Sequence, residues 1–278
     1  TPSVRFSKPA SASAIKRESL IGTITFFQLP AAPIQRSLCL YRAHERCVMT
    51  RLLYSLCGAD PDCRFSPHVW KVILALGHKG LDFTEVPTPF TAIKALEGGF
   101  SPTVPLLNDE GRLVRDSFDI ALYLEERYPD RPSLFDGEGG KALSRGIEGY
   151  MQFIVQPALT RIIVKDIHAR LAPVDQDYFR PSREARLGRT LEEVEAGSAA
   201  ELAALPAKLE PLRHVLKFQP FLGGGHPLFA DYIAFGAFQW ARIVSPKPVL
   251  AAGDPVADWF ERCLDLHGGR GRASRAAA

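Results

Sequence analysis

The chain has 278 residues, of which 46% are hydrophobic and 23% are charged. This composition is that of an ordinary globular protein with enough apolar residues for a core, and it excludes a disordered chain, a collagen and a disulfide scaffold. The 34 Lys and Arg residues against 31 Asp and Glu give a formal net charge of +3. A basic balance invites a nucleic-acid or membrane-surface interpretation, and the length predicts one or two domains.

The surplus of positive charge lies in the first 48 residues. They hold seven basic and two acidic residues, so residues 49–278 carry 27 basic against 29 acidic residues, a formal charge of −2. The one apolar run of this segment, residues 20–27, is too short to span a bilayer. The basic residues before this run resemble those of a signal peptide. The acid-poor composition of residues 1–48 resembles that of a transit peptide. We favour Met49 as the native start, with residues 1–48 as a non-native or disordered extension, and we expect neither nucleic acid nor a membrane as partner.

The cysteines are five in number, Cys39, Cys47, Cys57, Cys63 and Cys263. An odd count with no CxxC or Cys/His spacing predicts neither a disulfide framework nor a metal site. Free cysteines are typical of a reducing compartment, so we expect a cytoplasmic location.

Strands and helices alternate from residue 49 to about 135. Strands are predicted over 51–57 and 81–86, and the helix between them, 67–78, has Ser at its cap and Pro at its first position. A helical turn near 91–96 precedes strands over 104–107 and 112–115, joined by an Asn-Asp-Glu-Gly turn, and then a helix over 117–128. There is no GxGxxG or Walker loop, so the segment predicts a compact α+β layer rather than a nucleotide domain.

The remainder of the chain has the pattern of helices. They are predicted over 138–169, 183–203, 207–218, 229–244 and 255–267. The sequence therefore predicts an α+β domain over 49–129, a linker over 130–137, an all-α domain over 138–270, and a disordered tail over 271–278.

Three short segments carry residues suited to binding a small ligand. Ser66 is a helix cap, and its hydroxyl can also stabilise a bound thiolate beside the positive end of the helix dipole. Pro105 opens a strand, which fits either an edge strand or a cis Val104–Pro105 bond that turns backbone groups toward a ligand. Asp116 and Ser117 lie at a strand-to-helix turn, where such residues cap the helix or hold an amino-acid head group.

The order of these three segments is that of a glutathione site on a thioredoxin-like domain. From residue 49 to about 270 the chain resembles the glutathione transferase superfamily. Within it the chain is most similar to the etherase-like branch, the bacterial lignin β-aryl-ether-cleaving enzymes and their fungal relatives. The resemblance is carried by residues 65–71, 103–107, 115–129, 177–184, 190–194, 221–224 and 229–232.

The resemblance implies a role for each candidate residue. Ser66 would donate its hydroxyl to the glutathione sulfur and hold it as a thiolate. Val104, before a cis Pro105, would pair with the cysteinyl backbone of glutathione, and Asp116 and Ser117 would hold its γ-glutamyl end.

The resemblance also implies a homodimer and an acceptor site between the domains. Tyr150, Phe153 and Ile154 are candidates for lining that site, although their helical spacing fits an ordinary core stripe, which we prefer. Trp240 and Phe238 carry the same ambiguity.

The implied reaction is displacement of an aryloxide from a β-aryl ether of lignin type by the glutathione thiolate. Transfer to other electrophiles or hydroperoxides, and a non-catalytic glutathione-binding protein of the same fold, are the alternatives. Cys63 is a rival nucleophile, but the position that carries the thiol in cysteine-type transferases is Ser66 here.

The chain departs from the family pattern at the start of the helix 229–244. Leu228 replaces the usual Ser or Thr cap and Asp231 is kept, so we expect this helix to be capped by backbone or entered differently.

Overall fold

The computed structural model describes residues 51–277, so the predicted extension and Met49 lie outside the described residues. Its first half contains a mixed four-stranded sheet in the order β2-β1-β3-β4. β1 pairs in parallel with β2 and antiparallel with β3, which forms a hairpin with β4. The strands are β1 (Arg51–Leu56), β2 (Thr84–Thr88), β3 (Leu106–Asp109) and β4 (Arg112–Arg115).

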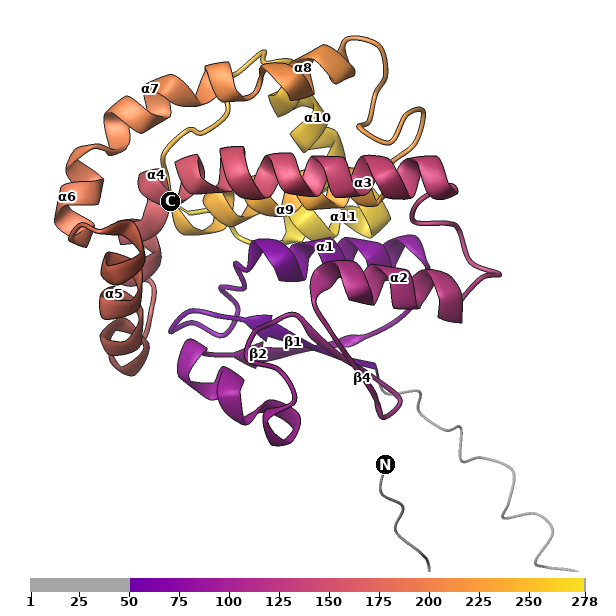
Figure 1. Ribbon diagram of the computed structural model, residues 1–278, viewed down its shortest axis with the longest axis horizontal. Helices are drawn as coiled ribbons and strands as arrows, with labels where there is room; N and C mark the ends of the chain where they lie inside the picture. Colours follow the sequence, from indigo (N-terminus) through magenta and orange to yellow (C-terminus); the bar gives the residue numbers. More distant parts are fainter. Residues whose placement is uncertain (1–50, 278) are drawn as a thin grey trace, which may run out of the picture. The chain divides into compact units, whose positions relative to one another are not determined.

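Helix α1 (Pro67–His78) lies between the sheet and the helical half, with α2 (Ser117–Arg127) beside it (Figure 1). Because α1 is covered on several sides, eight of its residues are buried, including Lys71. The ammonium of Lys71 lies 3.2 Å from the Glu148 carboxylate of α3. Burial lowers the pKa of Lys71, and the neighbouring Glu148 carboxylate opposes this shift. This buried ion pair joins the two halves of the fold.

The second half of the chain is helical, and no strand of the described residues follows β4. The predicted fold class, an α+β thioredoxin-like layer followed by an all-α layer, is confirmed. The helices are α3 (Glu138–Tyr150), α4 (Gln156–Ala169), α5 (Pro173–Leu187), α6 (Leu191–Ala196), α7 (Ser198–Lys208), α8 (Glu210–Leu216), α9 (Phe229–Val244), α10 (Pro255–Leu264) and α11 (Leu266–Ala273).

Several predicted helices differ from the structure, two of them because of local backbone chemistry. The helix predicted over 138–169 is divided by a π-helical turn at Met151–Val155. Pro157 follows this turn; it has no N–H to donate, and its ring excludes the regular bond to the carbonyl four residues earlier. The prediction of one helix over 183–203 is wrong: α5 begins at Pro173 and ends at Gly188, whose φ of 68° breaks the helix. A capping box at Thr190 then starts α6.

The start of α9 is held by a buried carboxylate instead of a Ser or Thr cap. Asp231 accepts hydrogen bonds from the backbone N–H groups of Leu222, Gly223 and Leu228 at 2.7–3.0 Å and from the Trp259 indole at 2.9 Å. Burial raises the pKa of Asp231, and the four donors oppose this shift. A Cβ on Gly223 would lie 2.6 Å from that of Leu228. Leu228 therefore acts by packing, and Asp231 alone carries the polar half of the cap.

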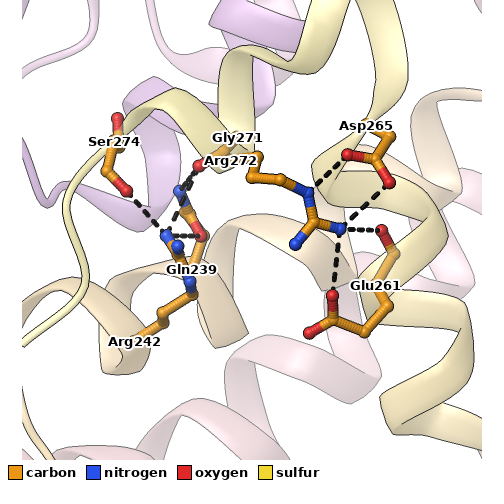
Figure 2. Close-up of polar contacts among 7 residues, drawn as sticks. All are labelled: Gln239, Arg242, Glu261, Asp265, Gly271, Arg272 and Ser274. Carbon is orange, nitrogen blue, oxygen red and sulfur yellow. Dashed lines mark hydrogen bonds and ion pairs between the residues drawn. The ribbon is translucent and has the colours of Figure 1, made fainter.

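The structure differs from the predicted disordered tail, since residues 271–277 lie against α9 (Figure 2). The side chain of Gln239 is fully buried and donates to the Gly271 carbonyl at 2.8 Å. Arg242 donates to the Ser274 carbonyl at 2.8 Å, and its own carbonyl accepts from the Ala277 N–H at 2.9 Å. The tail is anchored by polar groups of a distant helix, which no local pattern in the tail reveals.

On the other side of α11, Arg272 lies 2.5 Å from Asp265 and 2.9 Å from Glu261 (Figure 2). These three side chains are exposed to solvent, where an ion pair contributes little to the stability of the fold. The buried Gln239 contact is therefore the stronger anchor of the tail.

Candidate functional site

A cavity of about 750 Å³ lies between the sheet-bearing half and the helical half of the described chain. One wall is formed by the start of α1 and residues 102–104, and the other by the π-helical turn, α4 and α5. A volume of this size suits a ligand of small-peptide size together with a small aromatic molecule.

Ser66 lines this cavity at the N-terminus of α1. Its residue surface is only 4% exposed, and its hydroxyl oxygen accepts the Val69 N–H at 3.3 Å, which caps the helix as predicted. Because the oxygen serves as the cap acceptor, the hydroxyl hydrogen is left for a second partner. The N-terminal end of α1 also favours negative charge at this position.

The segment before β3 contributes Thr103 and Val104 to the same wall, whereas Pro105 does not line the cavity. The Val104–Pro105 peptide bond is cis, one of the two alternatives that the sequence left open. The Ser101 hydroxyl donates to the Thr103 carbonyl at 2.6 Å and holds this segment in shape.

Asp116 and Ser117 start α2 and do not line the cavity. Asp116 has a φ of 68°, and its Oδ1 atom accepts the N–H groups of Phe118 and Asp119 at 2.8 and 3.3 Å, so it caps α2. Its charge acts on His68, a cavity residue: burial lowers the pKa of His68 to about 4, Lys71 lowers it further, and Asp116 opposes both. The structure therefore brings Asp116 to the edge of the site and not into the cavity.

Only some of the candidate residues for the acceptor site line the cavity. Phe153 lines the cavity and is 75% exposed, so it is not part of a core stripe. Tyr150 does not line the cavity, and its hydroxyl donates to the Lys208 carbonyl on another side of the helix. Burial raises the pKa of Tyr150 to about 12. Trp240 lines the cavity, whereas Phe238 is buried against Trp259.

Cys63 lies in the loop before α1 and does not line the cavity. Burial raises the pKa of its thiol, and a hydrogen bond and the charge of Arg170 oppose that shift. A thiol with a raised pKa holds little thiolate at neutral pH and is a poor nucleophile.

Sequence reasoning gave no role to three arginines that line the cavity, Arg161, Arg183 and Arg186. The Cζ atom of Arg183 lies 4.4 Å from the ring centroid of Phe179 and 5.3 Å from that of Phe90. The sequence spacing did indicate an arginine without a helical ion-pair partner. Arg180 has the acidic Glu184 one turn later, whereas the residue one turn after Arg183 is a leucine, which cannot pair with its charge.

Within residues 51–277, no group of three or more His, Cys, Asp or Glu side chains is arranged to hold a metal ion. In the same part of the chain, no helix combines the length and apolar character needed to cross a membrane.

Comparison with known proteins identifies both halves. The N-terminal domain of glutathione S-transferases matches residues 61–132, and the C-terminal domain matches residues 142–266. The chain is 27% identical over 208 residues to the glutathione S-transferase-like protein ustS of Aspergillus flavus, covering 64% of this chain and 74% of that protein.

Solved structures agree with this family. The chain is similar to the glutathione transferase GSTFuA3 of Phanerochaete chrysosporium at 27% identity and a TM-score of 0.64, covering 82% of this chain and 98% of that one. It shares the fold of a glutathione S-transferase of Ceriporiopsis subvermispora solved in complex with glutathione, at 23% identity and a TM-score of 0.63, covering 81% and 94%. The chain belongs to the glutathione S-transferase superfamily.

Proposed function

We propose that this protein is a glutathione-dependent β-etherase, a transferase whose glutathione thiolate displaces an aryloxide from a β-aryl ether of lignin type. The observation that carries the proposal is the position of Ser66, which combines a cavity-lining hydroxyl with the N-terminus of a buried helix. The choice of ether rests on the resemblance of residues 65–71 and 177–184 to the etherase-like branch and on the aromatic lining of the cavity.

Ser66 lowers the cost of ionising the glutathione thiol. Its hydroxyl oxygen is held by the Val69 N–H, so its hydrogen is free to be donated to the sulfur. A hydrogen bond to the charged form and a helix N-terminus both lower the pKa of a thiol. The result is more thiolate at neutral pH without a general base.

The remaining glutathione contacts belong to the domain over 49–129. In this proposal the backbone of Val104, beside Pro105, pairs with the cysteinyl unit of glutathione, and Asp116 and Ser117 hold the γ-glutamyl end. The Oδ1 atom of Asp116 is occupied by the α2 cap, which leaves Oδ2 for the glutathione ammonium group. We also propose a homodimer and a cytoplasmic location, as the family resemblance implies.

The chemical step is a substitution at carbon. The thiolate attacks the carbon that bears the aryl-ether oxygen; the C–S bond forms as the C–O bond breaks, and the electron pair leaves with the aryloxide. The aryloxide then takes a proton from water, so no oxidant or reductant is needed. Phe153 and Trp240, which line the cavity, supply apolar surface for the two aromatic rings of such an ether.

The test measures retention on immobilised glutathione and then release of a fluorescent phenol from a β-aryl ether ketone. Ser66→Ala should lower kcat at least about 100-fold, because it removes the donor to the reacting sulfur. Thr190→Ala is the matched control, since Thr190 caps α6 and lines no part of the cavity. It should leave turnover unchanged. Cys63→Ser should also leave turnover unchanged, because Cys63 does not line the cavity and partial burial raises the pKa of its thiol.

Other results point to the alternatives. Turnover of haloaromatics or hydroperoxides but not of the ether would assign another acceptor. Binding of glutathione with no turnover of any electrophile would indicate a non-catalytic protein of the same fold. Absence of glutathione binding would contradict the site itself.

A further inference from the structure

The helical wall of the cavity carries positive charge that no carboxylate of the lining balances. Arg161 of α4 and Arg183 and Arg186 of α5 line it, and among the described residues that form the cavity there is no Asp or Glu. Arg161 lies 3.6 Å from the Glu201 carboxylate outside the lining, so the unbalanced charge is that of Arg183 and Arg186. Neutral polar side chains complete this wall, namely Gln152, Gln156 and Thr160.

Arg183 is the most deeply set of the three arginines. It is half-buried, whereas Arg161 and Arg186 are exposed. Its guanidinium lies over the ring of Phe179, and its Nη1 atom donates to the Ser182 hydroxyl at 2.9 Å. Stacking covers the faces of a guanidinium and leaves N–H groups along its edge to donate in plane.

The charge of Arg183 has no acidic partner within residues 51–277. Burial and the neighbouring Arg186 both lower the pKa of Arg183, and only Tyr178 opposes them. Arg180, on the same helix, is bonded instead to Glu184 and Glu192. A partly buried cation without a counter-ion is unfavourable, so an anion from a ligand would be stabilised strongly at Arg183.

We propose that Arg183, with Arg186 at the rim, binds an anionic group of the acceptor, so that the preferred electrophile is an aromatic compound that carries a carboxylate or a sulfonate. The proposal rests on the proposed function only in taking the second substrate to be an aromatic electrophile. The rings of Phe90, Tyr178 and Phe179 would lie beside the aromatic part while the guanidinium holds the anion.

Glutathione itself carries a carboxylate at its glycyl end, so the source of the anion must be distinguished. The glutathione contacts proposed above come from α1, residues 104–105 and the start of α2. The three arginines come from α4 and α5, on the other wall. This separation favours the acceptor as the source of the anion.

The experiment compares two fluorescent probes with one skeleton, 8-anilinonaphthalene-1-sulfonate and the neutral N-phenyl-1-naphthylamine, in the presence of saturating S-methylglutathione. Loss of a charge-assisted bidentate contact weakens binding by about tenfold or more. Arg183→Met should therefore raise the Kd of the sulfonate probe about tenfold and change the Kd of the neutral probe much less. Arg186→Met should also raise the Kd of the sulfonate probe selectively, by roughly a third of the fold-change that Arg183→Met gives, because Arg186 is exposed.

The matched control is Arg189→Met, which removes the same charge near the end of α5. Arg189 does not line the cavity but lines a different groove. It should change neither Kd. Equal losses for both probes in Arg183→Met would show a packing role and overturn the proposal. Loss of S-methylglutathione affinity with the probe selectivity intact would assign Arg183 to glutathione and also overturn it.

Two further points keep the test decisive. Where Arg183→Met does not fold, as judged by circular dichroism, the probe selectivity of Arg186→Met decides, and an unchanged selectivity overturns the proposal. The probes report binding alone, so failure of ether turnover with probe selectivity intact would contradict the proposed reaction while leaving the anion subsite in place.

Discussion

The carboxylate of Asp175 accepts the backbone N–H of Thr91 at 2.9 Å and so ties α5 to the segment that follows β2. Its second oxygen accepts the N–H of Phe90 at 3.2 Å, and the side chain is fully buried. Phe90 packs against Phe179 of α5, with ring centroids 5.5 Å apart. Asp175 therefore fixes one corner of the cavity by joining α5 to the segment that carries Phe90, a lining residue.

Asp175→Asn should loosen that corner. The amide oxygen can accept only one of the two backbone N–H groups. The amide nitrogen, itself a donor, faces the other N–H, so one buried donor loses its partner. We expect the free energy of unfolding to fall by about 2 kcal/mol and KM for the acceptor to rise more than KM for glutathione. Urea unfolding and steady-state kinetics measure these effects. Asp177→Asn, an exposed position on the same helix, is the control, and equal effects of the two variants would contradict this role.

The second prediction concerns a partly buried His–Tyr–His contact. The Tyr232 hydroxyl lies 2.6 Å from Nδ1 of His78 and 2.8 Å from Nε2 of His267. The hydroxyl donates only one hydrogen, so one ring accepts and the other donates. Protonation of both rings would leave the hydroxyl hydrogen without an acceptor.

Burial lowers the pKa of both His78 and His267 to about 4 from 6.5. The charges of Lys79, Glu125 and His226 act on His78, and those of His78 and Arg270 act on His267. The unfolded state binds more protons than the folded state between these values, so stability is lost as the pH falls from about 6.5 to 4.

Each histidine contributes at most about 1.4 kcal/mol per pH unit. Partial exposure of both rings brings the expected slope to about 1 kcal/mol per pH unit. The double variant His78→Gln/His267→Gln should flatten the pH dependence measured by thermal unfolding. His214→Gln, at an exposed position on α8, should retain the slope; an undiminished slope in the double variant would show that other groups are responsible.

The third prediction concerns the contact between α9 and the start of α1. A Cβ on Gly236 would lie 2.2 Å from the Pro67 carbonyl oxygen, a backbone atom that cannot rotate away. Gly236→Ala should therefore destabilise the protein by about 2 kcal/mol despite the better helix propensity of Ala. Because Pro67 adjoins Ser66, kcat should fall as well.

Gly146→Ala is the matched control for this prediction. Gly146 is an exposed position of α3 with no atom within 4 Å of an added Cβ. That change should raise the free energy of unfolding by up to about 1 kcal/mol. If Gly236→Ala behaved like Gly146→Ala, the close approach of α9 to α1 would be contradicted.

The sequence by itself determined the features that depend on neighbouring residues. The Ser66 cap, the limits of α1 and the hairpin of β3 and β4 follow from local hydrogen bonding and fixed backbone angles, so their residues predict them. Segment order then made the fold class predictable, because few arrangements bury one apolar face of each element.

Only the tertiary structure decided which side chains meet in the cavity. Phe153 lines it and Tyr150 does not, because the π-helical turn before Pro157 changes the rotation of the helix between them. Arg183 lines the cavity because α5 packs beside residues 90–93. Residues 271–277 lie against α9 because Gln239 donates to the Gly271 carbonyl. Such contacts join residues far apart in the chain, and helical spacing fixes the faces of one helix but not the face that each neighbour covers.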